Sequence, residues 1–173
     1  MAATTLAWVV LGLLAAERFA EIVLNRRHTK WLARHGARWH GADGFTLILL
    51  SQIALFALPI IETVWAPWAG PGWWTWPLLV IAFAAQVLRY WVIQTLGSRW
   101  NIRVVTLPGA PRITTGPYRF LTHPNYLAVA IEAAVIPLAL GAWLSACIVV
   151  PLALTALARR IRFEETALDA SIA

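Results

Sequence analysis

The sequence predicts an all-α integral membrane protein with five membrane helices, on the evidence of its composition, its long apolar runs and its basic loops. Of the 173 residues, 60% are hydrophobic and only 13% are charged, and the mean hydropathy is +0.68. Soluble domains average about 45–50% apolar and about 25% charged residues. The excess apolar surface is more than a water-soluble core absorbs, so lipid is expected to solvate much of it. The length favours a single domain, residues 1–173.

Three apolar runs approach the roughly 20 residues that a helix needs to cross a hydrocarbon core of about 30 Å. These predicted spans are Thr4–Leu24, Phe45–Val64 and Trp74–Leu96. A fourth apolar region, residues 127–157, is too long for one ordinary span and contains Gly141-Ala142-Trp143 near its middle. We interpret it as a tight helical hairpin with the arms Leu127–Leu140 and Trp143–Leu157.

Basic residues gather in three segments, and these segments predict the orientation. The first holds Arg26, Arg27, Lys30, Arg34 and Arg38, the second Arg99, Arg103, Arg112 and Arg119, and the third Arg159, Arg160 and Arg162. The loop Trp65–Trp73, in contrast, carries no charge and is rich in Trp, Pro and Gly. The positive-inside rule therefore places the N-terminus outside and the three basic segments and the C-terminus in the cytoplasm.

The net charge of +6 does not indicate a nucleic-acid partner, because the basic residues lie beside apolar runs. Thirteen of the fourteen are arginine, which hints at a GC-rich genome and hence a bacterial plasma membrane. Cys147 is the single cysteine, so no intramolecular disulfide is expected. His28, His35 and His40 lack the spacing of a compact metal site, and we interpret their segment as an amphipathic stretch lying on the membrane surface.

Five of the charged residues inside the predicted spans are candidates for a polar site, because an ionisable group there is costly and is expected to face a partner, water or the bundle interior. They are Glu17, Arg18, Glu21, Arg89 and Glu132. For Glu17, Arg18 and Glu21 the pattern favours structural ion pairs. For Glu132 it favours a catalytic role, because this residue lies about two turns beyond the loop motif described next. A small transporter or structural subunit, with these charges lining a polar path, is the non-enzymatic alternative.

The connector between the third span and the hairpin, Gly97–Asn125, is irregular but too apolar for disorder, so it is expected to fold against the cytoplasmic helix ends. It ends in the string from Gly116 to Tyr126, GPYRFLTHPNY. Pro124 suits a first helical turn, which places His123 and Asn125 at the mouth of the next helix, where unpaired backbone N–H groups favour an anionic partner. After the hairpin, Arg160 is followed by Glu164-Glu165, carboxylates that suit an ammonium group.

Together these two motifs resemble the isoprenylcysteine carboxyl methyltransferase family and its phospholipid N-methyltransferase relatives. The matching part covers about residues 97–168 and consists of Gly116 and Tyr118, then His123-Pro124-Asn125-Tyr126, a hairpin, and Arg160 with Glu164-Glu165. The resemblance implies an S-adenosylmethionine pocket lined by Ile113, Tyr118, His123, Pro124, Asn125, Tyr126, Glu164 and Glu165. It also implies that Arg160 contacts the methyl acceptor. Thr122 stands where the family usually has Arg or Lys, and Arg119 is a candidate substitute.

The resemblance implies methyl transfer to a lipophilic small molecule taken from the bilayer, without a metal. The pattern from Arg18 to Arg27 is similar to the bacterial branch of the family, which includes alkylpyrone O-methyltransferases. The expected acceptor atom is thus an acidic oxygen, a prenylcysteine-type carboxylate or an alkylpyrone or phenolic hydroxyl. Glu132 is the expected base where one is needed, with Arg89 or Arg160 holding the acceptor's negative charge. Phospholipid N-methylation is the enzymatic alternative.

Overall fold

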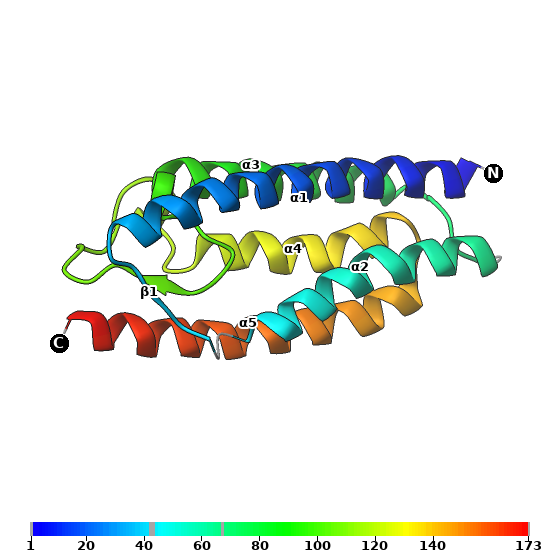
Figure 1. Cartoon of the computed structure of the whole chain (residues 1–173). Helices are drawn as coiled ribbons and strands as arrows, with labels where there is room; N and C mark the ends of the chain where they lie inside the picture. Colours follow the sequence, from blue (N-terminus) through cyan, green and yellow to red (C-terminus); the bar gives the residue numbers. More distant parts are fainter. Residues whose placement is uncertain (1, 42–43, 67, 173) are drawn as a thin grey trace.

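The computed structural model describes residues 2–41, 44–66 and 68–172. The ends of the predicted domain, residues 1 and 173, and residue 67 of the predicted loop Trp65–Trp73 lie outside the described residues. Five α-helices run along one long axis (Figure 1). They are α1 (Ala2–Arg34), α2 (Phe45–Trp65), α3 (Thr75–Leu96), α4 (Pro124–Ala139) and α5 (Trp143–Ile172). The all-α class and the helical hairpin, α4 and α5, are confirmed.

Within the described residues, three helical segments are long and apolar enough to cross a membrane. They are Phe45–Trp65, Thr75–Arg99 and Trp143–Leu168. The helix α4 is apolar but shorter, with 16 residues. The helix α1 carries Glu17, Arg18 and Glu21 within its length, which lowers its hydropathy.

Two helices extend beyond the ends that the sequence predicted. The first predicted span ends at Leu24, but α1 continues to Arg34. The segment around His28 therefore continues this helix, and its position on the membrane surface stays a prediction. Leu32 in this extension is only 2% exposed, so tertiary packing continues past the apolar run. The second hairpin arm was predicted to end at Leu157, but α5 continues to Ile172.

The hairpin is tight because Gly141 permits a turn that other residues would strain. Its φ is +68°, and a Cβ at this position would overlap the backbone of Gly70 in the loop between α2 and α3. The start of α3 is tied to the hairpin as well, since the Thr75 hydroxyl donates to the Ala139 carbonyl at 2.7 Å. This end of the bundle, which holds Gly141, is called the turn end below.

The opposite end, called the connector end, holds the irregular segment between α3 and α4. This segment contains the 3-10 helix η1 (Gly97–Arg99), the strand β2 (Val105–Thr106) and the 3-10 helix η2 (Gly116–Arg119). The strand β2 pairs antiparallel with β1 (Arg38–Trp39), which follows α1. As predicted, the connector folds against the helix ends instead of extending into solvent (Figure 1).

The main apolar core lies between the helices, in the half of the bundle toward the turn end. Residues from every helix contribute to it, among them Leu11 of α1, Leu55 of α2, Ala82 of α3, Ile136 of α4 and Val149 of α5. The most extensive packing joins α3 to α4 and α5 to both α2 and α4. The helix α4 is therefore the central helix, which explains why its side chains Ala128 and Glu132 are fully buried.

Candidate active site

The start of α4 lies beside the second half of α5 because the two helices are antiparallel arms of one hairpin. Pro124 occupies the first turn of α4, where its missing N–H costs no helical hydrogen bond. His123 is the N-cap residue and has a non-helical backbone, with φ −128° and ψ 63°. The continuation of α5 past Leu157 then places Arg160, Glu164 and Glu165 opposite this helix start.

Three side-chain contacts join the two segments, and a ring contact orders the helix start itself. The Tyr126 hydroxyl donates a hydrogen bond to Glu164 Oε2 and accepts one from Arg160 Nε at 3.1 Å. His123 Nε2 lies 3.2 Å from Glu165 Oε1. The rings of His123 and Tyr126 are stacked, with centroids 5.5 Å apart and planes inclined by 24°. The helix start and the helical tail therefore meet in one polar site at the connector end, as the family resemblance of the two motifs implied.

The connector forms a further wall of this site. Gly116 has φ +58°, and a Cβ there would overlap the side chain of Thr95 at the end of α3, so only glycine allows this close approach. Tyr118 follows in η2, and its pKa is raised above the ordinary value by burial and by the negative charge of Glu164. Tyr118 is thus a neutral phenol close to Glu164. Ile113 lies half-buried earlier in the connector.

Two polar groups of the site are more deeply placed. Arg160 is only 5% exposed, and its Nη2 donates to the carbonyl of Ile102 in the connector. The Oδ1 atom of Asn125 is buried, and in the described part of the chain no group hydrogen-bonds to it. A buried oxygen without a donor is costly, and it commonly marks a place where a ligand or water completes the structure.

The predicted residues Glu132 and Arg89 belong to a second polar network, in the middle of the bundle. Glu132 is fully buried and forms an ion pair with Arg18 of α1, and Arg89 Nη1 lies 3.7 Å from its Oε1. Glu21 accepts from Arg89 Nε and Nη2 and lies 3.0 Å from Arg18 Nη1. The ion pair expected of Arg18 and Glu21 is present, whereas the catalytic role expected of Glu132 and Arg89 stays a prediction.

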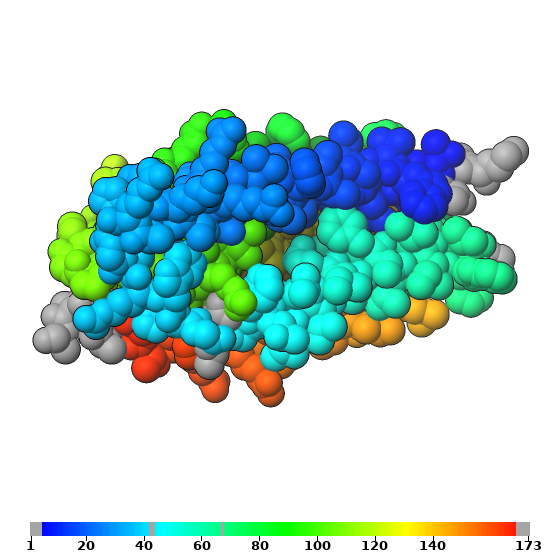
Figure 2. All heavy atoms as spheres, in the orientation of Figure 1, coloured from blue at the N-terminus to red at the C-terminus, as the bar shows by residue number. Residues whose placement is uncertain are grey.

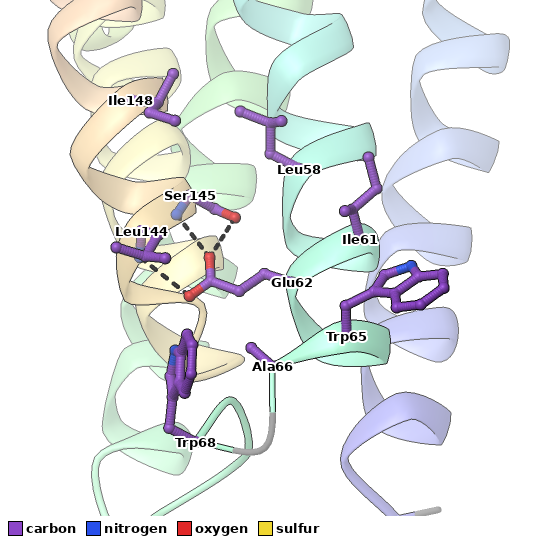
Figure 3. Close-up of a pocket in the computed structure, with 9 residues that line it drawn as sticks. All are labelled: Leu58, Ile61, Glu62, Trp65, Ala66, Trp68, Leu144, Ser145 and Ile148. Atoms are coloured by element: carbon purple, nitrogen blue, oxygen red, sulfur yellow. Dashed lines mark hydrogen bonds between the residues drawn. The ribbon is translucent and has the colours of Figure 1, made fainter.

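Sequence reasoning missed one charged residue inside a predicted span, Glu62. Its carboxylate accepts hydrogen bonds from the backbone N–H groups of Leu144 and Ser145, at 3.1 and 2.7 Å, and so caps the start of α5 (Figure 3). It lines a pocket of about 310 Å³ at the turn end, with apolar neighbours such as Trp65 and Ile148. The rule that singled out Glu132, an acidic residue in an apolar run, would also have found Glu62.

Comparisons with known proteins identify the family once this geometry is known. The model of the isoprenylcysteine carboxyl methyltransferase family matches residues 78–170, which include most of α3, the connector, α4 and most of α5. The chain belongs to this family. Family membership implies methyltransferase activity in general, and together with the three long apolar helices it suggests a membrane protein. The residues that form the polar site all lie inside the matched region, whereas α1 and α2 lie outside it.

Two bacterial relatives extend the similarity over nearly the whole chain. The uncharacterized protein YpbQ of Bacillus subtilis (strain 168) is 30% identical over 162 residues, which cover 94% of this chain and 96% of that protein. An uncharacterized protein of Haemophilus influenzae is 28% identical over 162 residues, covering 93% and 94%. No solved structure matches the chain. This branch of the methyltransferase family therefore includes α1 and α2 as well as the matched part.

Proposed function

We propose that the protein transfers a methyl group from S-adenosylmethionine to an acidic oxygen of a lipophilic acceptor. One observation carries the proposal: the helix start at His123 and Tyr126 and the helical tail at Glu164 and Glu165 close into one site. The residues of the two contacts are 42 and 38 positions apart in the sequence. A chance contact between such distant segments would not be expected to bring together both parts of the family motif.

The residues present suit the cofactor in charge and in hydrogen bonding. Glu164 and Glu165 supply two carboxylates for its ammonium group, and the start of α4 supplies backbone donors for its carboxylate. Asn125 Oδ1 is a buried acceptor that still lacks a donor. Tyr118, Pro124 and Ile113 supply the surrounding apolar and aromatic surface. When bound, the cofactor contributes an electrophilic methyl group on a positively charged sulfur.

The chain's own residues then position and desolvate the reacting groups. Arg160 is buried and cationic, so it is placed to hold an anionic acceptor oxygen in a site with little water. Tyr126 orients Arg160 and Glu164 through its single hydroxyl. Because an in-line displacement needs little covalent help from the enzyme, this positioning supplies most of the rate.

The need for a base depends on the acceptor. A carboxylate or an acidic pyrone enol is already ionised at neutral pH and needs none, whereas a simple phenol does. Glu132 stays the candidate base for a phenol, with Arg89 beside it, but its ion pairs with both arginines favour the acidic acceptor. The arginine-rich surroundings likewise favour an anionic acceptor over the cationic product of phospholipid N-methylation.

We further propose that all five helices cross the bilayer, with the N-terminus outside and the connector end in the cytoplasm, in a bacterial plasma membrane. The 16 residues of α4 span about 24 Å, so this central helix requires local thinning or shielding by its neighbours. In α1, ion pairs compensate the charges that lower its hydropathy. The acceptor is expected to arrive from the lipid, and the cofactor from the cytoplasm.

Calorimetry with the purified protein in lipid tests the cofactor site. His123→Ala and Glu164→Ala should each abolish measurable binding of S-adenosylmethionine while leaving the protein folded. Arg159→Ala is the matched control, because Arg159 precedes Arg160 on α5 but is exposed, and this variant should bind as the wild type does. Normal binding by both site variants would show that the assignment is wrong. The acceptor is then sought by incubating the protein with labelled cofactor and a lipid extract and identifying the labelled product.

A further inference from the structure

The second half of α1, which lies outside the family match, contacts the connector through polar side chains on one helical face. Asn25 Oδ1 accepts a hydrogen bond from the Ile102 N–H at 2.8 Å. His28 Nδ1 lies 2.9 Å from the Trp100 carbonyl and must donate to it, because a carbonyl only accepts. Thr29 Oγ1 accepts from Asn101 at 3.0 Å. Figure 2 shows the connector (green) emerging beside α1 (blue).

Among these contacts, the one at Ile102 differs because it continues into the candidate site. The N–H of Ile102 is held by Asn25 of α1, and its carbonyl accepts from Arg160 Nη2 of α5. Arg160 Nε in turn donates to Tyr126 of α4, whose hydroxyl donates to Glu164. A series of hydrogen bonds thus leads from α1 through Ile102 of the connector to the guanidinium group of Arg160, and from there through Tyr126 to the carboxylate of Glu164.

We propose that Asn25 is a positioning residue for Arg160 and acts through Ile102. An arginine side chain has several rotatable bonds, and two fixed acceptors are needed to orient its planar guanidinium. One acceptor, Tyr126, is fixed by α4. The other, the Ile102 carbonyl, belongs to irregular backbone and is fixed because Asn25 holds the same residue from the other side. This role rests on the proposed function, in which Arg160 holds the acceptor's anionic oxygen.

Arginine side-chain resonances give a direct test that needs no acceptor. The protein is labelled with ¹⁵N-arginine in lipid nanodiscs, and the Arg160 Nε–H signal is assigned by its loss in Arg160→Lys. Asn25→Ala should shift this signal and speed its exchange with water by about five- to tenfold, the equivalent of one lost hydrogen bond. Asn25→Asp keeps an oxygen acceptor for the Ile102 N–H and should restore the wild-type signal.

Thr29→Val is the matched control, because it removes a bond between the same two segments without touching Ile102. It should leave the Arg160 signal unchanged. An unchanged signal in Asn25→Ala, or equal changes in Asn25→Ala and Thr29→Val, would overturn the proposal. Cofactor calorimetry separates this result from the proposed function: if the wild type binds no S-adenosylmethionine, the function fails, while the Arg160 signal still reports whether Asn25 positions that side chain.

Discussion

The molecule contains two polar networks built from the same residue types, and their surroundings differ. The mid-bundle network joins Arg18, Glu21, Arg89 and Glu132 in direct ion pairs inside the apolar core. The connector-end network joins Arg160, Tyr126 and Glu164, but it also includes exposed or unpaired groups such as Glu165, which is 51% exposed, and Asn125 Oδ1. The charges of the first network compensate one another, although buried atoms such as Arg18 Nε lack a hydrogen-bond partner among the described residues. The second network is in addition partly open to solvent, through Glu165.

This difference indicates how a buried charge is to be interpreted. Charges in an apolar bundle must be compensated, and side chains that compensate one another are not free to bind a third molecule. The mid-bundle network therefore serves mainly to hold α1 against α3 and α4. A binding site needs polar groups that neighbours hold in position but that can still bond to a ligand. The connector end has such groups.

The largest expected effect comes from breaking the mid-bundle network. Glu132→Gln removes the carboxylate that pairs with Arg18 and faces Arg89, and it leaves these guanidinium groups under-compensated in the core. We expect the free energy of unfolding to fall by about 3–5 kcal/mol, the usual cost of removing one partner of a buried pair. Denaturant unfolding in detergent or lipid, followed by the tryptophan signal, measures the change.

Glu17→Gln is the control within the same network. Glu17 lies 3.9 Å from Arg18 and its side chain is 33% exposed, so its loss should cost less than about 1 kcal/mol. Equal losses for the two variants would contradict the distinction between buried and peripheral members. The same Glu132 variant also tests the base: methyl transfer that survives in the folded fraction would exclude Glu132 as an obligatory base.

Local signals in the sequence were sufficient to predict the parts of the fold that depend on them. Gly141 marked the hairpin turn, and Pro124 marked the start of α4. That the His123 motif and the Glu164 tail meet was implied by the resemblance to the methyltransferase family, and the antiparallel arms of the hairpin explain the contact. The helix ends at Arg34 and Ile172 were missed, because hydropathy indicates which residues can lie inside a bilayer and does not indicate where a helix ends.

Partner choice could not be predicted from the sequence. Which glutamate pairs with Arg18 depends on how α1 is rotated against α4, and a single apolar run carries little information about that rotation. The contact between Asn25 and Ile102 depends likewise on the irregular backbone of the connector. Glu62 itself could have been found as an acidic residue in an apolar run, but its partners, the backbone N–H groups of Leu144 and Ser145, could not have been predicted from any motif.

An intermediate effect is expected when the connector-end network loses the Tyr126 hydroxyl, which both Arg160 and Glu164 contact. Tyr126→Phe removes the group that joins Glu164 to Arg160 while preserving the ring stacked on His123. We expect the free energy of unfolding to fall by about 1–2 kcal/mol and the affinity for S-adenosylmethionine to fall about fivefold or more. Calorimetry and unfolding of the same sample measure both quantities. A loss of stability as large as that of Glu132→Gln would show that this network, too, is mainly structural.

The smallest effect should distinguish the two adjacent carboxylates. Glu165 is half exposed and contacts His123 at 3.2 Å, whereas Glu164 is less exposed and is held by Tyr126. Because exposed pairs contribute about 0–1 kcal/mol, Glu165→Gln should weaken cofactor binding by no more than about fivefold and leave unfolding unchanged. Glu164→Gln, its matched partner, should weaken binding far more. If the order were reversed, the exposed carboxylate would be the principal ligand of the ammonium group, and the site would lie nearer the open face of α5 than the Tyr126 contact indicates.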